Sequence, residues 1–514
     1  MIIVYHKNNK VVQLIRNGEE LPFLSKTMAV ILLDLAQSYP QDWLIWCDID
    51  LKPNLNLPKF ESIFHHHRIM VSYGIADENY ISAAIGYVEE SPFIKVNKSV
   101  TYPTWLMSSD VGGIHASVLK EIGAGIKATN FNYFLNSLAK IGMPLGLFCY
   151  SDPRLLKQNT LKIQKKRSAN HFSLFRFVSQ HYKKRWLVLL FLNLLLFERQ
   201  FPVIPFCYAW FFKSRKRTTL NLDAIPLQSS LKETGQKTID VIIPTIGRKQ
   251  YLYDVLKDLS GQTHLPQKVI IVEQNPKPES VSELDFLNTE SWPFIIKHIF
   301  THQAGACNAR NLALAEVTGE WVFMADDDIR CEEYFLEEVL KGMSGLGIQA
   351  VTTACYEKNY PVQKKIKNLQ QWKTFGSGCS IVKKEKLACI KYNESFEFGY
   401  GEDTDFGMQL RNSGTDVVFF PNHELLHIKA PLGGFRIKSV LPWHQDTIQS
   451  KPSPTVMLFN LLHLTKEQFE GYKLKLFFKY YRVQRIKNPI AYYRNFQKQW
   501  RKSIYWAEEL KRNQ

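Results

Sequence analysis

Residues 320–329 constrain the fold of this chain more than any other segment. Five apolar or small residues, 321–325, lead directly into three carboxylates, Asp326, Asp327 and Asp328. A short apolar run bounded by polar residues is typical of a fully buried strand in a parallel sheet. In open α/β sheets, ligands bind beyond the carboxyl ends of such strands. Because adjacent carboxylates repel one another, the pattern predicts a bound cation at this edge; a solvated acidic loop is the alternative.

The segments around these acids alternate between strand and helix patterns. Apolar runs at 239–245, 268–273 and 294–300 predict strands. An amphipathic stretch at 250–259 predicts a helix, and 302–315 predicts a glycine-containing turn that leads into an Ala/Leu-rich helix. Alternation at this spacing predicts a parallel sheet with right-handed crossovers.

The first third of the chain repeats parts of the second half. Residues 42–51 match 320–329 position by position, and Asp48 and Asp50 fall on the first and third acids. Two further matches follow in the same order: 104–114 with 371–381, and 130–134 with 402–406. Three ordered matches predict an internal duplication. Chance likeness between two α/β domains is the alternative.

The two copies differ where catalytic chemistry would lie. On this alignment Asn130 and Phe131 replace Glu402 and Asp403. The first copy also has too few residues before its acids to hold counterparts of the second and third strands. We therefore expect residues 1–153 to be a degenerate copy that keeps the sheet but has lost the active site, with a metal at its two remaining acids as an open alternative.

Two apolar stretches, 186–197 and 201–212, lie between the copies, flanked by basic clusters at 165–167, 183–185 and 213–217. As helices, each would be about 18 Å long, shorter than the ~30 Å hydrocarbon core of a bilayer. The pattern favours an interfacial or re-entrant hairpin on an anionic membrane face. A buried pair of inter-domain helices and a true span are the alternatives.

The net charge and the cysteine pattern indicate which kinds of partner the chain binds and in which cellular compartment it works. The net charge of +17 predicts an anionic partner such as a nucleotide, a phospholipid headgroup or nucleic acid. Basic and aromatic residues interleave from residue 471 onward, which suits a membrane surface or a packing helix; no base-recognition motif is present, so nucleic acid is not expected. The eight scattered cysteines and the lack of a signal-peptide pattern predict a cytoplasmic protein. The basic apolar stretches and the C-terminal helix predict that it works at the cytoplasmic face of the inner membrane.

These observations divide the chain into four parts. The expected domains are a degenerate copy at 1–153, a basic and apolar membrane-associating segment with a linker at 154–237, a catalytic domain at 238–436 and a basic aromatic helical region at 437–514.

The catalytic domain holds an ordered set of motifs. In chain order they are Pro244, Thr245 and Arg248; Glu273; Arg310 and Asn311; Asp326 to Asp328; Gly376 and Gly378; Glu402 and Asp403; and His427, Lys429 and Arg436. This set, over about 200 residues, resembles the family 2 glycosyltransferases. The resemblance implies the A-type glycosyltransferase fold, an α/β nucleotide-diphospho-sugar transferase fold, in two copies here.

The resemblance also implies roles for these residues. Asp326 and Asp328, with His427, would hold a divalent cation, Mn²⁺ or Mg²⁺, because such cations prefer carboxylate oxygens. Asp403, beside Glu402, would be the base that deprotonates the acceptor hydroxyl. The donor contacts would be Pro244, Thr245, Arg248, Glu273, Arg310, Asn311, Asp326, Asp327, Lys429 and Arg436. The acceptor side would be lined by Trp372, Gly376 and Gly378.

The expected activity is metal-dependent, inverting transfer of a sugar from a nucleotide-sugar donor to a glycan or lipid-linked acceptor, as in bacterial surface polysaccharide synthesis. A sugar-phosphate nucleotidyltransferase is one alternative, although the segment after the first strand lacks the expected glycine- and Arg/Lys-rich loop. A non-catalytic scaffold that binds glycan or protein is the other.

Overall fold

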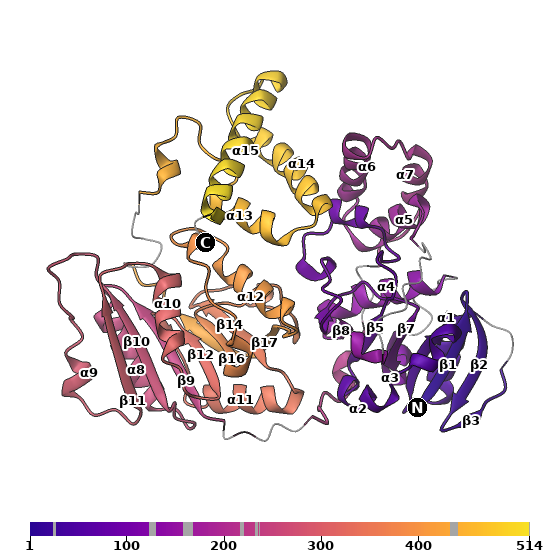
Figure 1. Ribbon diagram of the computed structural model, residues 1–514, viewed down its shortest axis with the longest axis horizontal. Coiled ribbons are helices and arrows are strands. Elements are labelled where there is room, and N and C mark those ends of the chain that lie inside the picture. Colours follow the sequence, from indigo (N-terminus) through magenta and orange to yellow (C-terminus); the bar gives the residue numbers. More distant parts are fainter. Residues whose placement is uncertain are drawn as a thin grey trace. The chain divides into compact units, whose positions relative to one another are not determined.

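The chain forms two compact units, and its C-terminal helices are divided between them (Figure 1). The computed structural model describes residues 1–23, 27–122, 130–157, 168–215, 220–231, 235, 237–431 and 440–512. Unit 1 comprises Met1–Leu231 with Leu464–Val483, and unit 2 comprises Lys232–His463 with Gln484–Gln514. The C-terminal region expected at 437–514 therefore contributes helix α14 (Lys466–Val483) to unit 1 and the rest to unit 2.

Unit 2 is built on a nine-stranded sheet with the order β11-β10-β9-β12-β16-β14-β17-β13, and β15 pairs with β17. The strands are β9 (Ile239–Thr245), β10 (Lys268–Gln274), β11 (Ile295–Thr301), β12 (Trp321–Ala325), β13 (Ile329–Arg330), β14 (Ala350–Glu357), β15 (Gln370–Gln371), β16 (Cys379–Lys383) and β17 (Val418–His427). Strands β11, β10, β9 and β12 are parallel, as the alternating pattern predicts. Strand β16 runs antiparallel to both β12 and β14, so the whole sheet is mixed.

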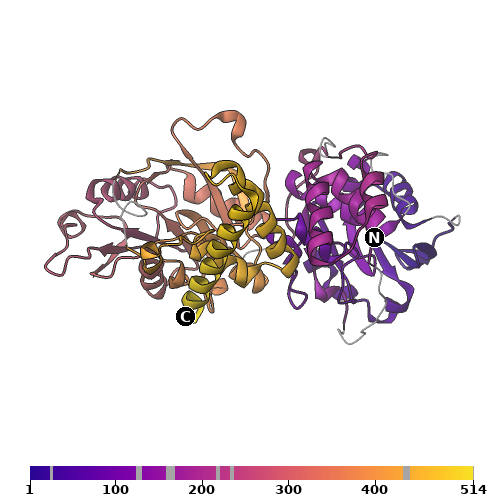
Figure 2. The same ribbon diagram turned by 90° about the horizontal axis from the view of Figure 1, so that it is seen from above.

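The helices of unit 2 are α8 (Lys249–Ser260), α9 (Phe286–Thr289), α10 (Ala306–Ala315), α11 (Phe335–Leu346), α12 (Glu402–Asn412), α13 (Pro454–His463) and α15 (Pro489–Arg512). Helix α10 packs against β9 and β10, and α13 packs against α15 (Figures 1 and 2). The buried face of α8 consists of Leu252, Val255, Leu256 and Leu259. This spacing of three and four residues is that of an amphipathic helix, and burial of each side chain contributes roughly 1.5–3 kcal/mol.

Unit 1 contains an eight-stranded sheet with the order β3-β2-β1-β4-β7-β5-β8-β6. Its strands are β1 (Ile2–Lys7), β2 (Lys10–Arg16), β3 (Glu19–Glu20), β4 (Trp43–Asp48), β5 (Ile69–Tyr73), β6 (Tyr102–Pro103), β7 (Val111–His115) and β8 (Phe148–Ser151). Its helices are α1 (Met28–Ser38), α2 (Phe60–Ile63), α3 (Ala116–Ile122), α4 (Phe131–Gly142), α5 (His171–His181), α6 (Arg185–Phe197) and α7 (Val203–Ala209), together with α14. Side chains of α1, α3 and α4 form its core with the sheet.

The two sheets share their central topology. Strands β1, β4, β7, β5 and β8 have the same order and the same relative directions as β9, β12, β16, β14 and β17. Beyond β1, however, unit 1 has the antiparallel strands β2 and β3 where unit 2 has the parallel strands β10 and β11. The shared order agrees with two copies of one fold, and the shorter N-terminal segment of the first accounts for the replaced strands.

The strand register corrects the alignment of the two copies by one residue. Trp43 pairs with His115 in unit 1, and Trp321 pairs with Lys383 in unit 2. His115 therefore corresponds to Lys383, one residue beyond the position that matching 104–114 with 371–381 assigns to it. Sequence similarity alone allows an alignment to slip by one residue, whereas the pairing of the strands determines the register.

Neither apolar stretch between the copies reaches the length of a membrane span. They form α6 and α7, and within the described ranges no helix is long and apolar enough to cross a membrane. Both helices pack with α5, and α6 also contacts α14. The basic cluster at 165–167 and part of that at 213–217 lie outside the described residues.

Candidate active site

A cavity of about 380 Å³ opens beyond the carboxyl ends of β9 and β12. Its lining includes eleven of the residues singled out from the sequence: Pro244, Thr245, Arg248, Arg310, Asp326, Asp327, Asp328, Gly378, Glu402, Asp403 and His427. These residues come from segments up to 183 residues apart in the chain. The fold therefore brings the acid triplet and the Glu402–Asp403 pair to one cavity.

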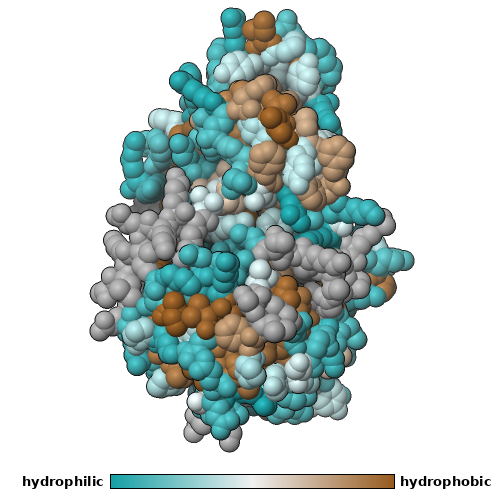
Figure 3. Space-filling view, turned by 90° about the vertical axis from the view of Figure 1, so that its right-hand side faces the viewer, coloured by the Kyte–Doolittle hydropathy of each residue, from teal (hydrophilic) through white to brown (hydrophobic). Residues whose placement is uncertain are grey.

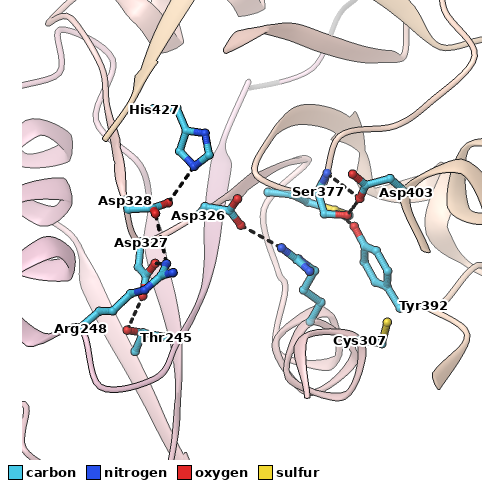
Figure 4. A network of polar contacts seen from close by, with 12 residues as sticks. Thr245, Arg248, Cys307, Asp326, Asp327, Asp328, Ser377, Tyr392, Asp403 and His427 are labelled. Atoms are coloured by element: carbon cyan, nitrogen blue, oxygen red, sulfur yellow. Dashed lines mark hydrogen bonds and ion pairs between the residues drawn. The ribbon is translucent and has the colours of Figure 1, made fainter. Parts of the chain in front are cut away.

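Asp327 holds the strand ends together from a buried position. Its carboxylate accepts hydrogen bonds from Thr245 Oγ1 at 2.7 Å and from Arg248 Nη1 at 2.6 Å (Figure 4). Burial raises the pKa of Asp327 to about 6, although the Arg248 charge opposes the rise. Because its oxygens are occupied by residues of the adjacent segment, Asp327 fixes Arg248 in the cavity wall.

Asp328 lies beside His427. Strand β13 pairs Ile329 with His427, which brings the imidazole Nε2 to 3.4 Å from Asp328 Oδ1. The other oxygen of Asp328 accepts a hydrogen bond from the Ala430 backbone at 2.9 Å. Burial opposes ionisation of Asp328, but the contacts with His427 and Ala430 outweigh it, so its pKa is lowered. The same contact raises the pKa of His427.

Asp326 points in a different direction from Asp328. Its Oδ1 accepts a hydrogen bond from Arg310 Nη2 at 2.8 Å, whereas His427 faces Asp328 (Figure 4). Among the residues that the structure describes, no three His, Cys, Asp or Glu side chains are gathered as a metal site. An adjacent carboxylate and imidazole at the cavity wall nevertheless have the donor chemistry that Mn²⁺ accepts. The expected ligands thus fit a cation chemically, with Asp326 engaged by Arg310.

Gly378 makes room for Asp326. A Cβ atom at Gly378 would lie 2.1 Å from Asp326 Oδ2, so no larger residue fits without moving the carboxylate. The backbone of Gly378 also accepts a hydrogen bond from Asp326 N at 3.3 Å. The close approach of Asp326 therefore explains why a glycine is found at position 378.

Asp403 is held at the start of helix α12 on the other side of the cavity. Its Oδ1 accepts hydrogen bonds from the backbone N–H of Ser377, at 3.0 Å, and from the Ser377 hydroxyl. Burial raises the pKa of Asp403, opposed by the Arg310 charge and by the Ser377 hydrogen bonds. Burial and then the Asp403 charge raise the pKa of Glu402 to about 7. Two neighbouring half-buried carboxyls with raised pKa values have the properties of an acid–base pair.

This pair predicts an unusual pH dependence. Only the ionised form of Asp403 can accept a proton, and burial raises its pKa, so activity should rise with pH through an acid limb above the ~4 of an ordinary carboxyl. Glu402→Gln removes the neighbouring charge, and the limb should then move to lower pH. A profile of kcat/KM against pH for both proteins measures this shift; an unmoved limb would contradict the coupling.

Two expected donor contacts lie outside the cavity lining. Glu273 accepts hydrogen bonds from Ser282 and from the Glu283 backbone, and His298 lies 2.9 Å away. The Asn311 side chain bonds both backbone groups of Tyr392. The Glu273 carboxylate and the Asn311 amide thus make hydrogen bonds that connect neighbouring segments of the chain. The adjacent residue Gln274 lines the cavity instead of Glu273.

Three other expected contacts also lie elsewhere. The Lys429 ammonium pairs with Glu357 at 2.6 Å, and both side chains are exposed. The Trp372 ring packs on Phe419, with 4.8 Å between ring centroids. Gly376 is likewise absent from the cavity lining. Arg436 lies outside the described residues, as do Gly433 and Gly434.

Glu397 is a cavity residue that the sequence patterns did not reveal. Its carboxylate accepts hydrogen bonds from the backbone N–H groups of Cys307 and Asn308, both at 3.0 Å, at the start of α10. Helix N-termini favour such anions. Gly305, with φ of +153°, leaves the room that this carboxylate needs. In the sequence, the only feature that points to this contact is Gly305, the glycine directly before α10.

Unit 1 has an amide at the position of Asp403 and a lysine beside its two acids. Ser109 N donates to Asn132 Oδ1 at 3.0 Å, the contact that Ser377 makes with Asp403. Asn132 is the second residue of α4, as Asp403 is of α12, which corrects the alignment that put Phe131 there. Lys7, at the end of β1, pairs with Asp48 at 3.6 Å and with Asp50. An amide thus stands where unit 2 has a carboxylate, and an ammonium neutralises the acids.

The mixed α/β sheet of unit 2 and the acids at its strand ends agree with the expected A-type glycosyltransferase fold. Residues 240–398 match the model of the family described as glycosyl transferase family 2. This region therefore resembles a family 2 glycosyltransferase domain. The match ends before Glu402, Asp403 and His427, so the roles of these residues rest on the geometry.

Comparison with solved structures gives remote similarities. S. aureus TarS 1-349 is 18% identical, with 37% of this chain and 60% of that chain covered and a TM-score of 0.32. The same protein in complex with UDP-GlcNAc is 16% identical over 46% and 70%, with a TM-score of 0.36. GalNAc-T7 with UDP, GalNAc and Mn²⁺ is 14% identical over 42% and 50%, with a TM-score of 0.33. No curated protein matches the chain.

Proposed function

We propose that unit 2 transfers a sugar, with inversion at the anomeric carbon, from a nucleotide-sugar donor to an acceptor hydroxyl. The observation that carries this proposal is the position of the acid triplet and of Asp403 in the lining of one cavity. Arg310 lies between them, because its guanidinium donates to Asp326 and its charge also acts on Asp403. In this proposal the donor phosphates bind beside the acid triplet, and the acceptor hydroxyl binds beside Asp403 in the same cavity.

Asp403 is the proposed base. Its Oδ1 is engaged by Ser377, which leaves the carboxylate oriented by two hydrogen bonds to accept the proton of the acceptor hydroxyl. The oxygen that loses this proton forms the new glycosidic bond, and the nucleoside diphosphate leaves with the electrons of the old one. Because the acceptor attacks the donor directly, without a covalent sugar–enzyme intermediate, one displacement inverts the anomeric centre.

Asp328 and His427, together with Asp326, are the residues that would hold a divalent cation, Mn²⁺ or Mg²⁺. When bound, such a cation neutralises the charge that develops on a diphosphate leaving group. Arg248 lies 3.3 Å from Asp328 and 2.6 Å from Asp327, so the wall that faces the phosphates carries its own positive charge. Arg310 supplies a second cationic group on the side of Asp326.

The proposed acceptor is a glycan or lipid-linked glycan presented at a membrane, as in the synthesis of bacterial surface polysaccharides, and the enzyme makes a peripheral contact at the cytoplasmic face. The net charge of +17 supports an anionic surface as the working environment, because positive charge concentrates anionic partners near the protein.

Hydrolysis of a panel of nucleotide sugars with Mn²⁺ or Mg²⁺ tests this function. We expect slow, metal-dependent release of nucleotide from one donor, since water replaces the missing acceptor. Formation of a nucleoside triphosphate from a nucleotide sugar and pyrophosphate would identify a nucleotidyltransferase instead. The absence of both hydrolysis and metal-dependent nucleotide binding for every donor would contradict the proposal and favour a scaffold.

A further inference from the structure

Helices α6 and α7 of unit 1 expose a concentration of large apolar side chains. We define the α6–α7 surface as Leu196, Phe197, Phe201, Ile204, Trp210 and Phe211. Phe201 is 67% exposed, Ile204 73% and Phe211 84%. Figure 3 shows apolar side chains on the face of the molecule that carries this hairpin. Large contiguous apolar patches on folded proteins mark interaction sites.

Helix α6 is apolar on both of its faces. Leu187, Leu190 and Leu194 are buried against the rest of unit 1, while Val188 and Leu195 on the opposite face are 42% and 38% exposed. A helix that is hydrophobic all round is normally surrounded by apolar material. The inner face of α6 packs against the rest of unit 1. Its outer face is equally apolar in sequence but is exposed to solvent.

The charges around this surface are almost all positive. Residues 170–215 contain seven Lys or Arg and a single acid, Glu198. Of the cations, Lys183, Arg185 and Lys213 are exposed near the ends of the hairpin away from its turn, and Arg199 is exposed in the turn. Basic residues beside an anionic bilayer are attracted to its surface potential. An apolar patch bordered by cations is complementary to acyl chains bordered by phosphate groups.

The dimensions of the hairpin fit insertion to a shallow depth. Helix α6 has 13 residues and α7 has 7, which correspond to about 20 Å and about 10 Å. Both are shorter than the ~30 Å hydrocarbon core. Aromatic side chains such as Trp210 and Tyr208 are typical of the headgroup level, where one end of the ring is wet.

We propose that the α6–α7 surface docks unit 1 onto an anionic phospholipid bilayer, with its apolar side chains at the boundary between headgroups and acyl chains. The inference names the surface that makes the membrane contact of the proposed function. The docking itself is argued from this surface alone, and only its biological purpose rests on the proposed function. The degenerate unit would then serve as the membrane anchor of the enzyme.

Co-sedimentation of the full chain with vesicles tests the docking. Wild type should bind vesicles of phosphatidylcholine and phosphatidylglycerol. The double variant Ile204→Glu with Phe211→Glu should bind at least about tenfold more weakly, because each substitution replaces an exposed apolar side chain of the surface by a negative charge. Both positions are exposed, so the variant should fold. A matched control, Val281→Glu with Val440→Glu, changes two exposed valines of unit 2 by the same charge and should bind as wild type does.

Two further measurements distinguish docking through this surface from vesicle binding through another part of the chain. Lys183→Gln with Lys213→Gln should weaken binding to the anionic vesicles but not to pure phosphatidylcholine. Nucleotide-sugar hydrolysis in solution should be equal in wild type and in the Ile204/Phe211 variant, so a failure of docking is distinct from a failure of the proposed function. Equal vesicle binding by that variant and wild type would overturn the inference. So would a wild-type dimer in sedimentation velocity that the variant abolishes, since a second copy would then cover the surface.

Discussion

Asp403→Asn should reduce sugar transfer by about 10²- to 10⁴-fold, the range that a general base contributes, while donor binding stays close to that of wild type. The amide keeps an oxygen that accepts the hydrogen bonds from Ser377, so the start of α12 should keep its geometry. It cannot accept the proton of an alcohol. Unit 1 shows that the fold tolerates this exchange, because Asn132 accepts the same hydrogen bond from Ser109.

Steady-state transfer and isothermal titration with the donor that hydrolysis identifies would measure the two effects separately. Glu402→Gln is the matched control. It neutralises the adjacent carboxylate, so we expect the pH profile to move and the loss of rate to be smaller. Loss of activity in Glu402→Gln with full activity in Asp403→Asn would assign the base to Glu402. A parallel loss of donor binding in Asp403→Asn would show that the residue supports the donor site.

The strands of the catalytic unit could be predicted because their signals are local. The apolar runs at 239–245 and 321–325 have the same bounds as β9 and β12. Parallel strands place their carboxyl ends at one edge, which is sufficient to bring the acid triplet near Thr245 and Arg248. The return of α12 and β17 to that edge followed from the family resemblance, because nothing in the local pattern measures distance across the chain.

Contacts between distant segments could not be predicted in this way. Lys429 pairs with Glu357, 72 residues earlier, on the neighbouring strand β14, and no pattern in either segment indicates this partner. Glu397 binds the start of α10 through backbone N–H groups, which every sequence has. The placement of α14 in unit 1 depends on contacts such as Gln468 with the Glu89 backbone, 379 residues away.

The alignment of the two copies failed for a related reason. Sequence similarity put Phe131 at the position of Asp403, whereas the hydrogen bond from Ser109 puts Asn132 there. The difference matters because an amide in place of the carboxylate keeps the hydrogen bond from serine but cannot accept a proton as the proposed base would. The Lys7 ammonium is the second such change, because it lies where Thr245 ends β9 and neutralises the acids of unit 1.

Asp328→Ala should remove metal-dependent donor binding, with activity lowered by at least about 100-fold, because cation stabilisation of a leaving group supplies several kcal/mol. The substitution removes the carboxylate that lies 3.4 Å from His427 and leaves the Ala430 N–H without its acceptor. Asp328→Asn keeps an oxygen for that N–H and removes only the charge. We therefore expect both variants to lose Mn²⁺ binding, while Asp328→Asn retains the thermal stability of wild type.

Titration with Mn²⁺, followed by electron paramagnetic resonance, measures the binding directly and does not depend on turnover. The duplication offers a control, since Asp50 of unit 1 aligns with Asp328 of unit 2 in the sequence. Lys7 neutralises Asp50, so Asp50→Ala should leave the Mn²⁺ stoichiometry unchanged. If Asp50→Ala lost a bound Mn²⁺ and Asp328→Ala did not, the metal would belong to the degenerate unit. Transfer in unit 2 would then depend on Arg248 and Arg310, whose guanidinium groups already face the acid triplet.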